Sequence, residues 1–228
     1  MTDDAARAAA AAAAVELVEP GMTIGLGSGR AVWKVIELLA ASGRPVRTAV
    51  ASSRSDELAR SAGFEVVELD GSVVLDLALD GADEVDPQLR LIKGGGGALL
   101  REKIVISAAR RFVVVAEEVK RVARLGEHFR LPVEVVRFGW RDTRRRLAEL
   151  LPDTEQRLRE DGEAYVTDEG HLILDCALPG DADADLDALA VAVKQVPGVV
   201  EHGLFIGYAE RALLGRADGS VDMIERAG

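Results

Sequence analysis

Three short segments in the first half of the chain carry the residues that could do chemistry. Asp80 and Asp83 lie in the run "LDLALDGADE", Lys93 precedes four glycines at residues 94–97, and Glu102 follows that run. These groups supply a proton acceptor, a cation and backbone N–H groups that can approach an anion closely. Enolisation next to a carbonyl needs such a set, because a base takes a proton from carbon while donors hold the enediolate oxygen.

The glycine run, "KGGGG", lies just before a helix that the sequence predicts from about Ala98 to Arg110. Glycine loses more backbone freedom on folding than any other residue, so four in succession exceed what a plain turn needs. Bare N–H groups and the partial positive charge of a helix start attract an anion. We interpret the run as an anion-binding loop beside Lys93, with a flexible turn as the alternative.

The two aspartates follow a predicted strand at residues 72–79. Ligands of parallel sheets bind beyond the carboxyl ends of the strands, where carboxylates can accept hydrogen bonds from hydroxyls or transfer protons. The alternative is that Asp80 and Asp83 shape a turn with Gly81 and cap a helix.

Glu102 lies about one turn into the predicted helix, on the same face as Ala98. Helical side chains lean towards the N-terminus, so its carboxylate is expected over the glycine loop. A surface glutamate paired with Arg101 or Lys103 is the alternative.

A second glycine-rich loop, "GLGSGRAV", spans residues 25–32. It is a poor dinucleotide fingerprint, because Arg30 stands where a third glycine is needed and Ser52-Ser53-Arg54, with no acid, ends the next strand. Serines, a cation and N–H groups suit a phosphate better, and a tight turn is the alternative. Lys120 follows another strand; it is either a phosphate ligand or a solvated surface lysine.

The elements that must position these residues alternate between strand and helix. Strands are predicted at 22–26, 46–52, 64–69, 72–79 and 111–117, with helices at 31–41, 55–63 and 98–110 and another before Pro20. Such alternation predicts a mostly parallel sheet covered by helices.

The pattern changes after residue 130. The predicted elements are a strand (131–138), a helix (142–151, with a continuation through "TEQRLRE" as an alternative end), a hairpin (163–178), a helix (184–196) and a strand (198–205). Their order is the ferredoxin-like pattern β-α-β-β-α-β. The tail forms a last hairpin with Asp218-Gly219 at its turn, which we expect to rejoin the first domain.

The composition of the chain argues against several classes of function. The 228 residues carry a formal net charge of −11, which repels phosphate backbones and argues against nucleic acid as a partner. Cys176 is the single cysteine, so no internal disulfide forms and a reducing compartment fits. Three scattered histidines give no zinc-ligand spacing. The alanine-rich start is too weakly hydrophobic for a signal peptide, and no stretch is apolar enough to span a membrane.

The chain resembles ribose-5-phosphate isomerase of the A type. The resemblance is carried, in order, by "GLGSG" (25–29), "DGADEVD" (80–86), "KGGGGALLREK" (93–103), "VVVAEEVKRV" (113–122), "LPVEV" (131–135), "VTDEGHLILD" (166–175) and "PGVVEHGLF" (197–205). It covers nearly the whole chain, and the block from Asp80 to Lys103 is its most specific part.

The resemblance implies an aldose-ketose isomerase that interconverts D-ribose 5-phosphate and D-ribulose 5-phosphate in the non-oxidative pentose phosphate pathway, without metal or other cofactor. It implies a cytoplasmic homodimer or homotetramer. The implied fold is α/β: a Rossmann-like, mostly parallel catalytic domain (1–130 plus 207–228) with an inserted ferredoxin-like α+β domain (131–206).

The same resemblance assigns the site residues. Glu102 is the proton-transferring base, and Asp80, Asp83 and Lys93 complete the catalytic set. The implied sugar-phosphate ligands are Ser28, Gly29, Arg30, Ala31, Asp80, Gly81, Ala82, Asp83, Lys93, Gly94, Gly95, Gly96 and Lys120.

The first loop departs from the family pattern. Arg30-Ala31 replaces a Ser-Thr pair, so two hydroxyls near the substrate phosphate are missing, and Arg30 can supply a charge-assisted contact instead. Arg7 stands where the family often has lysine. The departure at Arg30-Ala31 gives one alternative function, an isomerase with altered sugar-phosphate preference. Two further alternatives are independent of it: a non-catalytic sugar-phosphate sensor, and a relative of the CoA-transferases with Glu102 as nucleophile.

Overall fold

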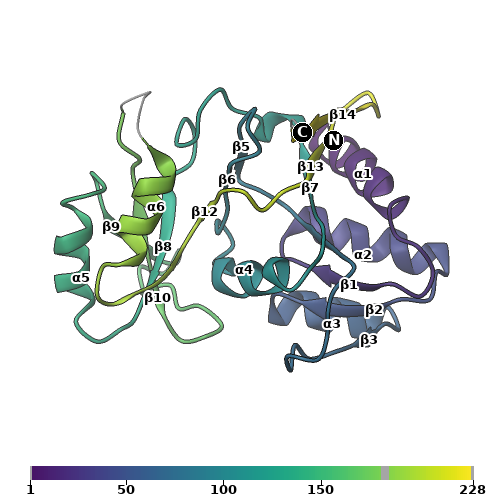
Figure 1. The fold of residues 1–228 in the computed structure, drawn as a ribbon, viewed down its shortest axis with the longest axis horizontal. Coiled ribbons are helices and arrows are strands. Elements are labelled where there is room, and N and C mark those ends of the chain that lie inside the picture. The colour runs from purple at the N-terminus through teal and green to yellow at the C-terminus, as the bar shows by residue number, and fades with distance from the viewer. Residues whose placement is uncertain (1, 181–184, 227–228) are drawn as a thin grey trace.

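The computed structural model describes residues 2–180 and 185–226. They form a large lobe and a small lobe, with a short third sheet between them (Figure 1). The expected limits at residues 1 and 228, and the helix start at residue 184, lie outside the described residues.

The large lobe is built on a seven-stranded sheet in the order β14-β13-β7-β4-β1-β2-β3. Its strands are β1 (Thr23–Leu26), β2 (Arg47–Val50), β3 (Glu65–Val66), β4 (Leu77–Asp80), β7 (Phe112–Glu117), β13 (Arg211–Gly215) and β14 (Val221–Glu225). Every pairing is parallel except that of β14 with β13, as the sequence predicts. The order reverses between β1 and β4, and such a switch point is where doubly wound sheets bind ligands.

Strand β7 shows why the sequence forms a central strand here. Its residues are buried on both faces of the sheet, which accounts for the nearly continuous apolar run "FVVVA". Val113 and Val115 pack in the cluster that contains residues of the first two helices, whereas Phe112 and Val114 pack with Phe205 on the other face. The alternation follows from the two-residue period of a strand.

Four helices cover the large sheet: α1 (Thr2–Val15), α2 (Arg30–Ser42), α3 (Ser53–Ser61) and α4 (Leu99–Ser107). Ser52 caps α3 by accepting a hydrogen bond from Ser55 N. Helix α2 starts directly after Gly29, whose φ of +98° suits glycine, and its N-terminus has no side-chain cap. The helices predicted for this lobe are confirmed, with ends shifted by a few residues.

A three-stranded sheet joins the lobes in the order β12-β6-β5, formed by β5 (Glu84–Val85), β6 (Leu91–Ile92) and β12 (Leu204–Phe205). The sequence did not predict this sheet, because two-residue strands show no periodicity. The prediction of one strand over 198–205 is wrong, since the segment is divided between β11 (Val199–His202) in the small lobe and β12 here.

The small lobe contains β8 (Leu131–Val135), α5 (Trp140–Leu147), β9 (Glu155–Gln156), β10 (Leu172–Cys176), α6 (Leu186–Lys194) and β11, with the antiparallel sheet order β11-β8-β10-β9. The predicted β-α-β-β-α-β order is present. The predicted helical continuation through "TEQRLRE" is wrong, because Glu155 and Gln156 pair with β10 instead.

The predicted hairpin over 163–178 is confirmed only around its turn. Val166 forms an antiparallel bridge with Leu172, and Gly170 N donates to Thr167 O. The regular partner of β10 is β9, earlier in the chain, so residues 157–171 form a long irregular excursion between the two strands. Cys176 is fully buried at the end of β10, and burial raises the pKa of its thiol to about 11.

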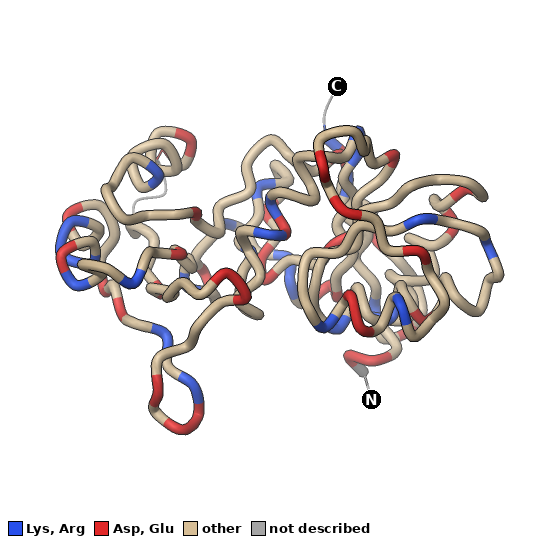
Figure 2. The backbone as a smooth tube through the Cα atoms, turned by 90° about the horizontal axis from the view of Figure 1, so that it is seen from below, with Lys and Arg blue, Asp and Glu red and all other residues tan. Residues whose placement is uncertain are grey.

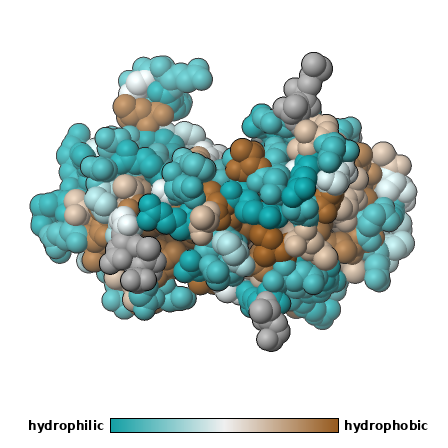
Figure 3. All heavy atoms as spheres, turned by 90° about the horizontal axis from the view of Figure 1, so that it is seen from above, coloured by the Kyte–Doolittle hydropathy of each residue, from teal (hydrophilic) through white to brown (hydrophobic). Residues whose placement is uncertain are grey.

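The tail rejoins the large lobe as predicted, because β13 pairs with β7 and β14 follows as the edge strand. The last strand, β14, therefore lies near the first helix, α1 (Figure 1). Charges of both signs are spread over both lobes (Figure 2), and hydrophilic side chains cover most of the face shown in Figure 3. Within the described residues, no helix has the length and apolarity needed to cross a membrane.

Candidate active site

A cavity opens at the switch point, beyond the carboxyl ends of β1 and β4. Every predicted site residue lines it except Asp80, together with Val115 and Glu117. Asp80 lies fully buried at the end of β4. The structure therefore brings together four segments that are separated along the sequence: the first glycine loop, the DGAD segment, the second glycine loop with α4, and Lys120.

Lys93 stands between the two carboxylates. Its Nζ atom lies 2.9 Å from Asp80 Oδ2 and 3.1 Å from Glu102 Oε2, and all three side chains are almost completely buried. The aligned hydrogen bond of the ammonium goes to Gly81 O at 2.7 Å. Within the described residues, Asp80 Oδ2 and Glu102 Oε2 have no well-aligned hydrogen bond, so both oxygens keep the capacity to accept one from a ligand.

Burial and mutual repulsion change the acidity of this cluster. Burial is the largest cause that raises the pKa of Glu102, the negative charge of Asp80 adds to it, and Lys93 only partly offsets both, so the pKa is about 8. Burial also raises the pKa of Asp80. For Lys93, burial alone would lower the pKa, but the neighbouring carboxylates outweigh it and raise the pKa. A carboxyl with a pKa near the working pH can both accept and return a proton.

The first glycine loop holds Asp80 from one side. Asp80 Oδ1 accepts hydrogen bonds from Ser28 N at 3.2 Å and from Gly81 N at 2.7 Å. A Cβ atom at Gly27 would lie only 1.8 Å from Asp80 Cγ. Glycine is therefore required at position 27 for the carboxylate to reach its place beneath the loop.

The second glycine loop is held by Asp83, whose Oδ2 accepts a hydrogen bond from Gly95 N at 2.7 Å. Gly94 and Gly97 have φ values of +108° and +82°, which favour glycine, and a Cβ at Gly95 would lie 2.6 Å from Asp83. A Cβ at Gly96 would meet nothing within 4 Å, because Gly96 faces open space. The loop therefore has a defined conformation that depends on glycine and on the contact with Asp83.

The lining of the cavity also includes groups suited to a phosphate. Arg30 and Lys120 line the cavity beside the uncapped N-terminus of α2, and Ser28 Oγ donates to Ser52 Oγ at 3.0 Å. Arg7 is not among the lining residues; its Nη2 lies 2.6 Å from Glu117 Oε1. Arg7 therefore neutralises a carboxylate at the cavity wall.

The sequence analysis missed two residues that support the glycine loop from the small lobe. Arg157 Nη1 donates to Gly94 O at 2.8 Å and to Gly95 O at 3.1 Å, and Tyr165 Oη donates to Gly96 O at 2.9 Å. Both lie about 60 residues or more from the loop along the chain. No local pattern links such distant positions.

No metal-ligand cluster is evident: within residues 2–180 and 185–226, no three His, Cys, Asp or Glu side chains are grouped as ligands. His171 Nδ1 lies 2.9 Å from Glu134 Oε1, and His202 is buried at the end of β11.

Comparison with known proteins gives one consistent result. Residues 48–219 match the family model described as ribose 5-phosphate isomerase A (phosphoriboisomerase A). The ribose-5-phosphate isomerase A of Roseiflexus castenholzii is 50% identical, covering 98% of this chain and 97% of the relative, and that of Ruegeria pomeroyi is 45% identical, covering 96% and 87%.

Solved structures agree. Ribose 5-phosphate isomerase A from Methanocaldococcus jannaschii has a TM-score of 0.89 and 36% identity, covering 96% of this chain and 97% of that one. A D-ribose-5-phosphate isomerase in complex with phospho-erythronic acid has a TM-score of 0.92 and 31% identity, covering 99% and 100%.

The switch-point cavity with its buried acid-lysine-acid cluster defines an α/β isomerase, an enzyme that moves a proton within one substrate. The chain belongs to the ribose-5-phosphate isomerase A family.

Proposed function

We propose that the chain interconverts D-ribose 5-phosphate and D-ribulose 5-phosphate, in the non-oxidative pentose phosphate pathway, with Glu102 as the base. The observation that carries this assignment is the contact of one buried lysine with two buried carboxylates, Asp80 and Glu102, beside an anion loop. A sugar phosphate bound with its phosphate at Arg30 and Lys120 extends its carbonyl end towards the glycine loop.

In the forward direction, ionised Glu102 removes the proton from C2 of the open-chain aldose. The electron pair forms the C1–C2 double bond, and the carbonyl π electrons move to oxygen, giving an enediolate. Lys93 and the N–H groups of the glycine loop stabilise that negative charge. The proton of the C2 hydroxyl moves to the C1 oxygen, which leaves the negative charge on the C2 oxygen. Protonated Glu102 then gives its proton to C1 as the C2 carbonyl forms, which yields the ketose. Asp80 and Asp83 accept hydrogen bonds from sugar hydroxyls.

We also propose that residues 131–206 are a separate ferredoxin-like domain inserted into a catalytic domain of residues 1–130 and 207–228. Two separate hydrophobic clusters, one around β1 and one around β8, support this division. We further propose a cytoplasmic location, which the single buried thiol supports. The resemblance supports a homodimer or homotetramer. Size-exclusion chromatography with light scattering measures the assembly.

A second candidate function is an isomerase with an altered sugar-phosphate preference. The observation that favours it is the Arg30-Ala31 pair, where the first glycine loop departs from the family pattern. Arg30 is exposed and lines the cavity. A competition assay among pentose and hexose phosphates decides this point, because a substrate turned over faster than ribose 5-phosphate would replace it as the preferred one.

The base assignment is tested with Glu102→Gln. The amide keeps the shape but cannot accept the proton, so kcat falls by ~10³-fold or more while substrate binding is largely retained. Turnover is followed by NMR in deuterated water containing EDTA, where wild-type protein gives ribulose 5-phosphate with deuterium at C1.

The matched control is Glu57→Gln, an exposed glutamate on α3 that pairs with Arg54. It should leave kcat unchanged. A Glu102→Gln protein with wild-type turnover would contradict the assignment of the base, whereas a wild type without product or exchange would contradict the reaction itself.

A further inference from the structure

The glycine loop is held from outside the catalytic lobe. Arg157 and Tyr165 belong to the excursion between β9 and β10, and together they bind the carbonyl oxygens of three successive glycines, 94 to 96. Arg157 is itself fixed, because Nε donates to Asp175 Oδ2 at 2.8 Å and Nη2 binds the other carboxylate oxygen. Its side chain is 13% exposed, so the guanidinium group is mostly shielded from water.

The carbonyl contacts decide where the loop N–H groups point. Described peptide bonds are all trans, so each C=O points opposite to the N–H of the following residue. Holding Gly95 O on the small-lobe side therefore turns Gly96 N–H away from Arg157. Gly96 lines the cavity, and within the described residues its N–H donates to no protein group. It is therefore available to bind an oxyanion.

The neighbouring N–H groups already donate hydrogen bonds within the protein. Gly95 N donates to Asp83 Oδ2 at 2.7 Å, and Gly97 N donates to Gly94 O at 3.0 Å. A loop of glycines has many alternative peptide orientations, and a 180° flip of the Gly95–Gly96 peptide would present a carbonyl to the enediolate. That flip would break the Arg157 contact with Gly95 O.

We propose that Arg157 and Tyr165 are positioning residues of the isomerase reaction: they hold the glycine-loop carbonyls outward, so that Gly96 N–H faces the enediolate oxygen. The small lobe thereby completes an oxyanion site in the large lobe. This inference rests on the proposed function.

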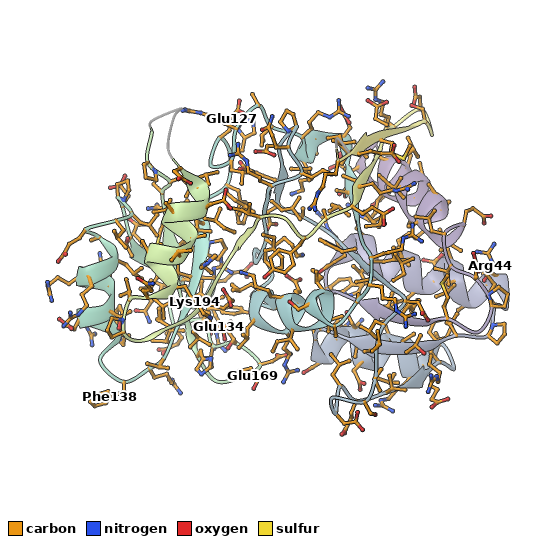
Figure 4. The ribbon with its side chains drawn as sticks, in the orientation of Figure 1. Arg44, Glu127, Glu134, Phe138, Glu169 and Lys194 are labelled. Atoms are coloured by element: carbon orange, nitrogen blue, oxygen red, sulfur yellow. The ribbon has the colours of Figure 1, made fainter. Side chains whose placement is uncertain are left out.

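The excursion is also fastened to the large lobe beside the loop. Asp168 Oδ2 accepts hydrogen bonds from Ser53 N and Oγ, both at 3.0 Å, and Arg101 on α4 pairs with Glu169. Figure 4 shows Glu169 where the excursion passes beneath α4. Tyr165 also packs against the loop, since a Cβ at Gly97 would lie 2.3 Å from its hydroxyl. The excursion is thus held near Arg157 by Asp175 and beyond Tyr165 by the contacts of Asp168 and Glu169 with the large lobe.

The test uses two variants. Tyr165→Phe removes one hydroxyl and keeps the ring, and Arg157→Met removes the guanidinium group. Because a misplaced oxyanion donor weakens the transition state rather than ground-state binding, kcat should fall by ~10–100-fold with KM within about threefold. The affinity for phospho-erythronic acid, whose carboxylate carries the negative charge that an enediolate develops, should fall in parallel with kcat/KM. The double variant should lose less than the product of the single losses.

Arg159→Met is the matched control, because Arg159 lies on the same excursion and pairs with the exposed Asp161. It should keep wild-type constants. Thermal unfolding shows whether each variant folds. If Arg157→Met does not fold, the kinetic constants of Tyr165→Phe test the positioning role.

Wild-type kcat in both variants, or a rise in KM with unchanged affinity for phospho-erythronic acid, would overturn the positioning role. An inactive wild-type protein would instead refute the proposed function, so the two failures are distinguishable.

Discussion

Asp80, Lys93 and Glu102 form a buried cluster in which two acids share one cation. Such a cluster carries one negative charge when both acids are ionised, and burial makes that charge unfavourable. Burial therefore raises the pKa of both acids. Asp80 accepts hydrogen bonds from two backbone N–H groups, which favour its ionised form, whereas Glu102 Oε2 accepts none that is well aligned. The raised pKa of Glu102 suits the proposed transfer of a proton from carbon.

The pH profile of kcat/KM follows from this arrangement. The base must be ionised, so kcat/KM should rise with pH and level off above the pKa of Glu102, about 8. Asp80→Asn removes a neighbouring negative charge, which lowers the pKa of Glu102 and moves the rise to lower pH. Initial rates between about pH 6.5 and 9.5 measure both profiles, because the second ionisation of the substrate phosphate, near pH 6, lies below this range. A rise at the same pH in both proteins would contradict the coupling.

At the scale of elements, the turn between β1 and α2 makes room for Asp80 because Gly27 has no side chain. Gly27 lets the loop pass directly over Asp80. The pattern of strands and helices around the sheet was predictable from the sequence, because each strand is a run of apolar residues between turn signals. The position of Gly27 against Asp80 was not, because it depends on the pairing of β1 with β4, more than 50 residues apart.

Gly27→Ala tests this close approach. The added methyl overlaps the Asp80 carboxylate, so we expect a loss of about 1–3 kcal/mol in the free energy of unfolding and a loss of ~10-fold or more in kcat as Asp80 and Lys93 shift. Chemical denaturation and steady-state kinetics measure the two effects. Gly180→Ala is the control, because a Cβ there meets nothing within 4 Å. Equal behaviour of the two variants would show that the loop adapts to the methyl group.

The other site residues differ in how far the sequence could identify them. The residues of the DGAD segment and the glycine loop were predictable because they lie at strand ends and in short motifs. Arg157 and Tyr165 were not, because an arginine and a tyrosine in an irregular segment are usually surface residues and only the docking of the small lobe reveals their contacts. The three-stranded sheet was missed for the same reason, since long-range pairing rather than periodicity defines it.

At the scale of the whole molecule, the two lobes meet at a buried lysine that is next to Glu102 in the sequence. Lys103 Nζ donates to Glu201 Oε1 at 2.9 Å, to His202 O at 2.7 Å and to Leu204 O at 3.0 Å, and it lies 4.5 Å from the centre of the Phe205 ring. One turn of α4 thus presents Glu102 to the cavity and Lys103 to the chain segment that returns from the small lobe. The proposed base and the contact between the lobes therefore depend on the same helix.

Lys103→Met should therefore destabilise the molecule. The substitution leaves Glu201 with one cationic partner fewer and two buried carbonyls without their donor, at a cost of about 3 kcal/mol, or about 6–12 °C in Tm. Lys194→Met is the matched control, because Lys194 also pairs with Glu201 but its side chain is 48% exposed, so the loss should stay below about 1 kcal/mol. Differential scanning calorimetry gives both values, and equal shifts would refute the structural role of Lys103.

The burial of Cys176 has a practical consequence for spectroscopy. A thiol with a pKa of about 11 and no exposed surface reacts very slowly with maleimides at neutral pH. A cysteine introduced at Phe138, which is 93% exposed and projects from the small lobe (Figure 4), would be the one readily labelled position. A fluorophore or spin label can therefore report on motion of the small lobe in the otherwise unaltered protein.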